Sequence, residues 1–176
     1  MNDLSFHITD IANNSLRAEA SEVDIDIREE GNRVILSITD NGTGMDEETL
    51  ARARNPFYTS RTTRKVGLGL PFLFQNAEQT GGSVTIDSEL GKGTKVTAVF
   101  HSDHIDMPPQ GDLAGTMALL ITGIPQINFV FHYQTGKGTF SISSMEIKDA
   151  LGDIPISHSQ VMLWVKELIQ ENITAL

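Results

Sequence analysis

The chain has 176 residues and 39% hydrophobic content, enough for one packed domain or one domain with an appendage. Thirteen basic residues against 23 acidic ones give a net charge of −10, so we expect neither nucleic acid nor a membrane as the main partner. The absence of cysteine excludes disulfides, thiolate metal sites and cysteine nucleophiles. Because neither a signal-peptide pattern nor a membrane-length apolar run is present, we expect a cytoplasmic protein.

The first hundred residues alternate between helical and strand patterns. Apolar residues recur at helical spacing from Leu4, and Val23, Ile25 and Ile27 alternate with polar residues as in a half-buried strand. Asp46 is placed to cap a short helix, and Gly81-Gly82 is placed to end a longer one. The expected elements are a helix at 4–20, strands at 23–28 and 34–38, a helix at 46–54, a loop at 56–66, a helix at 67–80, and strands at 83–88 and 94–100. This order predicts helices on one face of a mainly antiparallel sheet.

The pattern restarts after residues 102–111, which contain Pro108-Pro109 and are expected to form a linker between residues 1–101 and a small C-terminal α+β unit at 112–176. The expected elements there are a helix at 112–122, strands at 127–131 and 139–143, a helix at 144–151, and a last helix from Ser157 or Ser159 to about Glu171. The last helix has an apolar stripe of Val161, Trp164, Val165, Leu168 and Ile169, which is more typical of a core than of a partner surface. The unit either completes the core or presents a docking face.

Three polar residues of the first helix share one face. Asp10, Asn14 and Arg17 fall at i, i+4 and i+7, which places a carboxylate, an amide and a guanidinium on one stripe. An amide oxygen can complete a Mg²⁺ shell, and an arginine pairs well with phosphate oxygens. A solvated polar face is the alternative, and for this stripe by itself it is favoured.

Two further segments have the composition of a nucleotide site. Residues 40–45, Asp-Asn-Gly-Thr-Gly-Met, follow an apolar strand; Asp40 could accept a hydrogen bond from the amine of adenine, and the glycines allow close approach of the backbone. The same residues could form an ordinary turn. The glycines of Gly67-Leu-Gly-Leu-Pro71 open a helix and expose its free amides, as a phosphate cradle or as a plain loop-to-helix junction. P-loop and Rossmann motifs are missing from the sequence.

Five segments in a fixed order make the chain resemble the GHKL ATPases, which include DNA gyrase, the ninety-kilodalton heat-shock chaperone, histidine kinases and MutL. The segments are DIANNSLRA at 10–18, DNGTGMD at 40–46, NPFYTSR at 55–61, VGLGLP at 66–71 and GGSVTIDSELGKGT at 81–94. They are similar to the N, G1, F and G2 boxes of that superfamily. The match covers residues 1 to about 100, and 56–100 is most similar to the catalytic domains of sensor histidine kinases.

The resemblance implies an α/β two-layer sandwich, the Bergerat fold, which holds ATP with Mg²⁺ between the first helix and a lid. It implies a Mg²⁺ ligand at Asn14, a basic phosphate contact at Arg17 and an adenine contact at Asp40. It further implies a base pocket shaped by Gly42, Gly44 and Thr94, a lid formed by Phe57 and the 58–66 loop, a phosphate contact at Arg61, and a phosphate cradle at Gly67 and Gly69. Met45, Leu68 and Leu70 belong to the same matched motifs and are expected to bind nucleotide. Asp10 stands where the family usually has a glutamate or histidine that activates water or the acceptor; it is one methylene shorter than glutamate.

The resemblance leaves two functions open. A histidine kinase of ordinary design has a helical hairpin with a phosphoaccepting histidine ahead of its N box, and here the N box begins within ten residues of the start, while His7 lacks the acceptor surroundings. We therefore expect a stand-alone ATP-binding module that acts as a kinase or ATPase in signal transduction on a separate protein. The alternative is a regulatory binder like the anti-sigma factors, switched by nucleotide with little or no catalysis. A dimeric machine like MutL or gyrase needs a longer transducer domain than the remaining residues offer.

Overall fold

The computed structural model of the chain describes residues 2–55 and 69–176. Its helices are α1 (Leu4–Arg17), α2 (Glu47–Ala53), α3 (Gly69–Gln79), α4 (Leu113–Gly123), α5 (Ser144–Leu151) and α6 (Ser159–Ala175). Its strands are β1 (Glu22–Glu30), β2 (Arg33–Asp40), β3 (Ser83–Glu89), β4 (Gly93–His101), β5 (Asn128–Thr135) and β6 (Gly138–Ser143). The chain order of these elements is the one that the sequence predicts.

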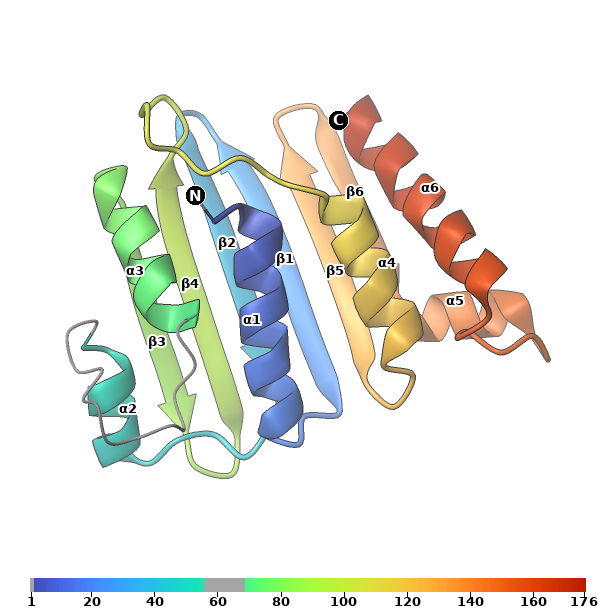
Figure 1. Cartoon of the computed structure of the whole chain (residues 1–176), viewed down its shortest axis with the longest axis horizontal. Coiled ribbons are helices and arrows are strands. Elements are labelled where there is room, and N and C mark those ends of the chain that lie inside the picture. The colour runs from blue at the N-terminus through green and yellow to red at the C-terminus, as the bar shows by residue number, and fades with distance from the viewer. Residues whose placement is uncertain (1, 56–68) are drawn as a thin grey trace.

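The strands form one six-stranded sheet in the order β3-β4-β2-β1-β5-β6. All neighbouring strands are antiparallel except β1 and β5, which are parallel. Helices α1, α3 and α4 lie side by side over one face of the sheet (Figure 1). The predicted two-layer α/β architecture with a mainly antiparallel sheet is therefore confirmed.

The alternation of apolar and polar residues along the strands decides which side chains enter the core. In β1 the apolar residues Val23, Ile25 and Ile27 are fully buried, whereas the intervening Asp24 and Asp26 remain partly exposed. Successive side chains of a strand point to opposite faces, so the apolar set packs under the helices and the acidic set lies on the other face. Burying each of these aliphatic side chains stabilises the fold by roughly 1.5–3 kcal/mol, which fixes the register of the strand.

The predicted signals for helix ends are confirmed. Asp46 is the N-cap of α2, and its carboxylate accepts a hydrogen bond from the Thr49 N–H at 2.7 Å. The helix α3 ends at Gln79, and the N–H of Gly82 then returns to the carbonyl of Ala77 at 2.9 Å. These local bonds satisfy backbone groups that a helix end would otherwise leave unpaired.

The C-terminal part continues the sheet of the first part. Strand β5 pairs with β1 over seven residue pairs, from Glu22 with Asn128 to Arg28 with Gln134. Segment 102–111 is irregular and is fastened to the start of α1, because the Leu4 N–H donates to the Pro109 carbonyl at 2.9 Å. Residues from both parts form one hydrophobic core. The sequence divides the chain into a domain at 1–101, a linker at 102–111 and a unit at 112–176. That these ranges are separate folding units stays a prediction, although their strands share one sheet.

Helix α6 runs to Ala175, beyond the expected end near Glu171, and one residue of its predicted stripe is misplaced. Val161, Val165 and Ile169 are buried as expected, but Trp164 is 44% exposed. At 100° per residue Trp164 lies about 100° around the helix from Val165, which is beyond the strip that faces the core. The expectation that Trp164 is a core residue is wrong. None of the helices in the described ranges combines the length and apolar character needed to cross a membrane.

A buried polar pair joins α1 to α3. His7 is fully buried, and its Nε2 lies 2.8 Å from the Asn76 Nδ2. Among the described residues its Nδ1 has no hydrogen-bond partner. Burial lowers the pKa of His7 from the ordinary 6.5 to about 4, and the nearby Asp3 carboxylate partly offsets this effect. The ring is therefore neutral at neutral pH, and a positive charge here would be costly.

We expect His7 to make the protein acid-sensitive. Since its folded-state pKa lies below its unfolded value, the stabilisation is complete above pH 6.5 and is lost as the pH falls towards 4. The loss amounts to about 3 kcal/mol of unfolding free energy. Urea denaturation of His7→Gln, which keeps an acceptor for Asn76 without titrating, should show a shallower pH dependence than wild type. The exposed His104→Gln should follow wild type, and parallel curves for all three proteins would contradict this assignment.

Candidate functional site

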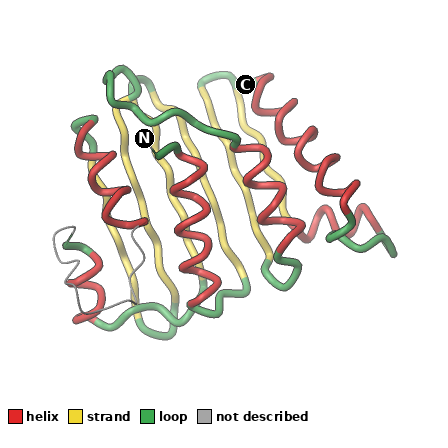
Figure 2. Tube along the Cα trace, viewed as in Figure 1, coloured by secondary structure: helices red, strands yellow, loops and turns green. Residues whose placement is uncertain are grey.

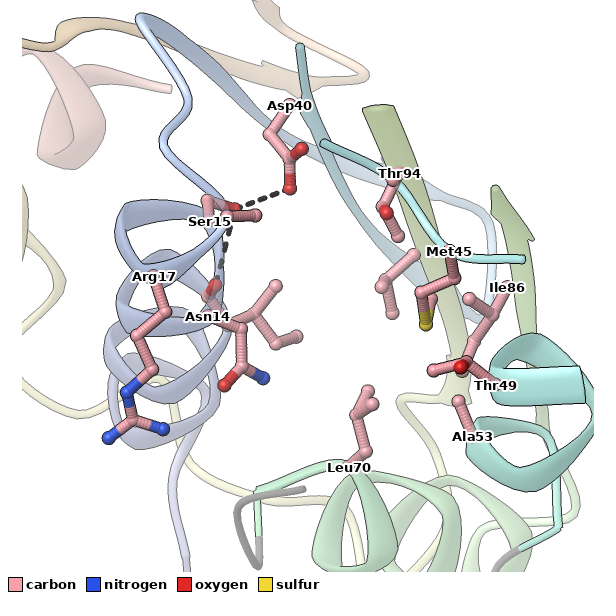
Figure 3. Close-up of a pocket in the computed structure, with 14 residues that line it drawn as sticks. Asn14, Ser15, Arg17, Asp40, Met45, Thr49, Ala53, Leu70, Ile86 and Thr94 are labelled. Atoms are coloured by element: carbon pink, nitrogen blue, oxygen red, sulfur yellow. Dashed lines mark hydrogen bonds between the residues drawn. The ribbon is translucent and has the colours of Figure 1, made fainter. Parts of the chain in front are cut away.

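Two of the three polar residues predicted on the first helix lie at a cavity. Asn14 and Arg17 of α1 both contribute to the lining of a space of about 250 Å³ between α1, α2 and the sheet. Asn14 points into this space, and the Arg17 side chain extends away from its centre towards solvent (Figure 3). The helical spacing of the motif thus brings an amide and a guanidinium to the mouth of the cavity.

Asp40, at the end of β2, lies at the other end of the cavity (Figure 3). Its Oδ2 accepts a hydrogen bond of 2.6 Å from the Ser15 hydroxyl of α1, and its Oδ1 accepts one of 2.9 Å from the Gly42 N–H. The Ser15 hydroxyl also lies 3.3 Å from the Ile11 carbonyl. One donor on each oxygen fixes the plane of the carboxylate, and each oxygen keeps a lone pair for another donor.

The walls between these two ends are mostly apolar. Figure 3 shows Met45, Thr49, Ala53, Leu70, Ile86 and Thr94 around the space, together with the polar residues at its ends. Its volume is slightly below the roughly 300–1,000 Å³ typical of small-molecule sites. An apolar slot with a carboxylate at one end fits a flat heteroaromatic base with an amine donor, and the open end fits the charged remainder of such a ligand.

A hydroxyl pair on the β3–β4 hairpin supports the wall. The Ser88 and Thr94 hydroxyls, on paired residues, lie 2.8 Å apart, and Ser88 also accepts a hydrogen bond of 2.9 Å from the Met45 N–H. The loop that contains Met45 is thereby fastened to the sheet. Gly44 has φ +68°, and a Cβ there would lie 2.1 Å from the Glu89 carbonyl oxygen, so this position requires glycine.

Asp10 lies beside the first residue of α3. A Cβ added to Gly69 would lie 2.6 Å from the Asp10 Oδ2 and 2.7 Å from its Cβ, so the missing side chain of Gly69 lets the carboxylate approach this helix end. Burial raises the pKa of Asp10, and the nearby Arg17 partly offsets this. Asp10 is not among the described residues that line the cavity, whereas Leu70, one residue beyond Gly69, is.

Four predicted site residues fall outside the described residues. Phe57, Arg61, Gly67 and Leu68 belong to segment 56–68, so their predicted roles as lid, phosphate contact and cradle stay predictions. The structure does bring together the remaining predicted residues, either on the cavity wall or next to it. Those on the wall are Asn14, Arg17, Asp40, Gly44, Met45, Leu70 and Thr94, and those next to it are Asp10, Gly42 and Gly69.

Sequence reasoning missed two hydroxyl residues that form hydrogen bonds within the site, and it also missed Thr49 on the cavity wall. Ser15 follows Asn14 directly and is buried with its hydroxyl on Asp40, and Ser88 connects Met45 to Thr94. A signal for Ser15 was present, because a small polar residue stands on the apolar face of an amphipathic helix and must find a partner when buried. Ser88 gave no such signal, since serine is common in exposed strands. The apolar wall residues Ile86 and Val96 were predicted only as strand residues.

Comparison with known proteins agrees with this geometry. Residues 2–104 match the family described as histidine kinase-, DNA gyrase B-, and HSP90-like ATPase. Sporulation kinase E of Bacillus subtilis (strain 168) is 43% identical over 68 residues, which cover 39% of this chain and 8% of the kinase. Sensor kinase CckA of Brucella abortus (strain 2308) is 39% identical over 66 residues, which cover 37% of this chain and 7% of that protein. The match is thus to a small portion of each relative.

A solved structure shares the fold. The N-terminal domain of a DNA repair protein superposes with a TM-score of 0.55 and 18% identity, over 86% of this chain and 58% of that one. The likeness extends beyond residue 104 and therefore includes part of the C-terminal strands and helices. The Bergerat-type architecture expected from the motifs is confirmed. With more than half of its length matched, the chain belongs to the family of histidine kinase-, DNA gyrase B-, and HSP90-like ATPases and is an ATP-binding module of the histidine-kinase-like type.

Proposed function

We propose that this ATP-binding module uses ATP with Mg²⁺ to phosphorylate or regulate a separate protein in the cytoplasm. The observation that carries the proposal is the cavity with Asp40 at one end and Asn14 and the exposed Arg17 at the other. This arrangement separates an apolar slot, suited to a base, from a polar opening, suited to phosphates. The sensor kinases that match the chain support a role in phosphoryl transfer.

The Asp40 end of the cavity would select adenine. Ser15 and Gly42 each donate to one oxygen of Asp40, so the carboxylate is held as a pure acceptor facing the slot. The exocyclic amine of adenine is a donor and is complementary to it, whereas the 6-oxo group of guanine is an acceptor and would be repelled. Gly42, Gly44, Met45 and Thr94 shape the space around the base.

The open end of the cavity would hold the phosphates. The Asn14 amide oxygen is a suitable Mg²⁺ ligand, and the ion commonly completes its shell with substrate phosphates and water. Bound there, Mg²⁺ would neutralise charge on the phosphate oxygens during transfer. Arg17 lies near enough to add positive charge once its side chain turns inward, and the start of α3 at Gly69 and Leu70 offers helix amides to an anion.

Asp10 is the residue we assign to proton removal. Attack on the γ-phosphorus by water or by an acceptor side chain forms a new bond to phosphorus, breaks the bond to ADP and releases a proton from the nucleophile. Asp10 of α1 lies beside Gly69, the first residue of α3, near the proposed phosphate end, and its raised pKa suits a base better than that of an ordinary aspartate.

A regulatory switch is the second candidate. Asp10 lies outside the described cavity lining, and it is one methylene shorter than the glutamate usual in the family. A displacement of the base by about 1 Å can cost about 100-fold in rate. If Asp10 does not reach the nucleophile, nucleotide binding alone would change the affinity for a protein partner, as in anti-sigma factors.

Asp10→Asn distinguishes the two functions. We expect it to reduce phosphate release or partner labelling from γ-labelled ATP by about 100-fold or more, with ATP affinity nearly unchanged. Candidate acceptors are proteins encoded beside this one, tested with and without Mg²⁺. The exposed Asp153→Asn is the matched control and should retain wild-type turnover. Tight ATP binding without turnover in the wild type would overturn the enzymatic proposal and favour the switch.

A further inference from the structure

Helix α2 forms one wall of the candidate ATP site. Its Thr49 and Ala53 line the cavity, and in Figure 3 both lie beside Ile86 of β3. The helix lies at the end of the sheet that β3 forms, and it contacts that strand (Figures 1 and 2). The separation of α2 from β3 therefore sets the width of this part of the cavity.

Burial alone holds α2 weakly. Of its seven residues only Ala53 is buried, and Leu50 packs against the core while it stays partly exposed. An alanine buries little more than a methyl group, so the apolar contacts of α2 stabilise its position less than those of a longer amphipathic helix would. The ion pair between Arg52 and Glu48 lies within the helix and does not attach it to the sheet. The position of α2 therefore depends on polar contacts as well.

Hydrogen bonds join both ends of α2 to β3. Just before the helix, the Met45 N–H donates to the Ser88 hydroxyl at 2.9 Å. At the other end, the guanidinium of Arg54, the C-cap residue, donates twice to the Ile86 carbonyl, from Nε at 2.9 Å and from Nη2 at 2.7 Å. Ser88 and Ile86 are two residues apart on the same strand. One strand thus holds the helix at two points.

The Arg54 contact links the two walls of the cavity directly. The Ile86 side chain is 1% exposed and lines the cavity, while its carbonyl accepts the bonds from Arg54. Arg54 follows Ala53 of the other wall without an intervening residue. A guanidinium can place two donors on one acceptor because its N–H groups form a rigid fork. The ion pair of Arg54 with Asp87 is longer, at 3.6 Å, and joins two exposed side chains, so it contributes less.

We propose that Arg54 is a positioning residue that sets the width of the slot for the base, and that without its bonds to Ile86 the helix α2 turns away from β3 about the Met45 contact. The inference rests on the proposed binding of adenine in this cavity. Arg54 is not among the described residues that line the cavity, so it acts through Thr49 and Ala53. These two residues lie along the apolar part, whereas residues of α1 form the polar end. The effect of Arg54 should therefore fall on the base and not on the phosphates.

Hydrogen exchange and ligand affinity of the full chain test this proposal. Without nucleotide, Arg54→Met should raise the exchange rate of the α2 amides about tenfold and leave β4 as in wild type. In calorimetric titrations it should lower the affinity for adenosine and for ATP with Mg²⁺ by the same factor, about tenfold. Arg54→Lys, which keeps the charge and can place one donor on the carbonyl, should lie between Arg54→Met and wild type. Arg52→Met, the same change two positions earlier, and Asp87→Asn should both match wild type.

Each outcome decides the proposal. Wild-type affinity of Arg54→Met for both ligands overturns it, and so does a loss confined to ATP, because Arg54 would then act at the phosphate end. Equal losses in Arg54→Met and Arg52→Met also overturn it, since lost charge would explain both. If Arg54→Met does not fold, Arg54→Lys decides by the same comparisons. A wild type that binds neither adenosine nor ATP refutes the proposed use of the cavity instead, and the exchange of the α2 amides then decides by itself whether Arg54 anchors the helix.

Discussion

Asp40→Asn is expected to lower the affinity for ATP about 100-fold while the protein stays folded. The Gly42 N–H can only donate, so the asparagine must present its oxygen there and its NH₂ group at the position of Oδ2. Ser15 can then turn its hydroxyl proton to the Ile11 carbonyl, so the fold keeps its hydrogen bonds. The NH₂ group, however, meets the amine of adenine as one donor against another, and a lost charged hydrogen bond with an unpaired group costs roughly 3 kcal/mol.

The same variant should change the base preference. A 6-oxopurine presents an acceptor where adenine presents a donor, so the ratio of ITP to ATP affinity should rise in Asp40→Asn. Calorimetric titration of both nucleotides with Mg²⁺ measures this ratio. Asp149→Asn, an exposed change on α5, controls for the lost charge. Ser15→Ala should cost about tenfold and keep the preference for ATP, because the carboxylate remains an acceptor. Unchanged ATP affinity in Asp40→Asn would remove the basis for the proposed adenine contact.

Gly44→Ala is expected to destabilise the fold by about 2–5 kcal/mol and to weaken ATP binding. A left-handed residue with a Cβ costs roughly 1–2 kcal/mol, and the clash with the Glu89 carbonyl adds the cost of a backbone shift. The shift would move Met45 and the loop that lines the cavity. Urea denaturation and ATP titration measure the two effects.

Gly31 provides a matched control for this prediction. It has a similar φ of +61°, but nothing lies within 4 Å of an added Cβ. Gly31→Ala should therefore cost only about 1–2 kcal/mol and leave ATP affinity unchanged. Equal destabilisation by the two variants would show that backbone conformation, and not the contact with Glu89, explains the requirement at Gly44.

Features set by short-range chemistry could be predicted from the sequence. The alternation in β1, the Asp46 cap and the glycines after α3 each depend on residues within a few positions, and the structure confirms all three. The motif residues were also predictable, because Asn14 and Arg17 lie on one helix and Asp40 ends a strand. The family and the two-layer fold followed from the order of these motifs.

Tertiary structure decided the contacts between residues that are far apart in the chain. The parallel pairing of β5 with β1 joins segments about a hundred residues apart, and no local pattern encodes which strand accepts a neighbour. Ser15 meets Asp40 across 25 positions, and Asp10 meets Gly69 only because α1 packs beside α3. Trp164 shows the same limit, since helical spacing predicts a stripe but only the position of α4 decides which edge of it is covered. By itself the sequence determined the order of the elements and the family of the chain. Packing determined which groups of the candidate ATP site meet, because contact at long range depends on the whole core.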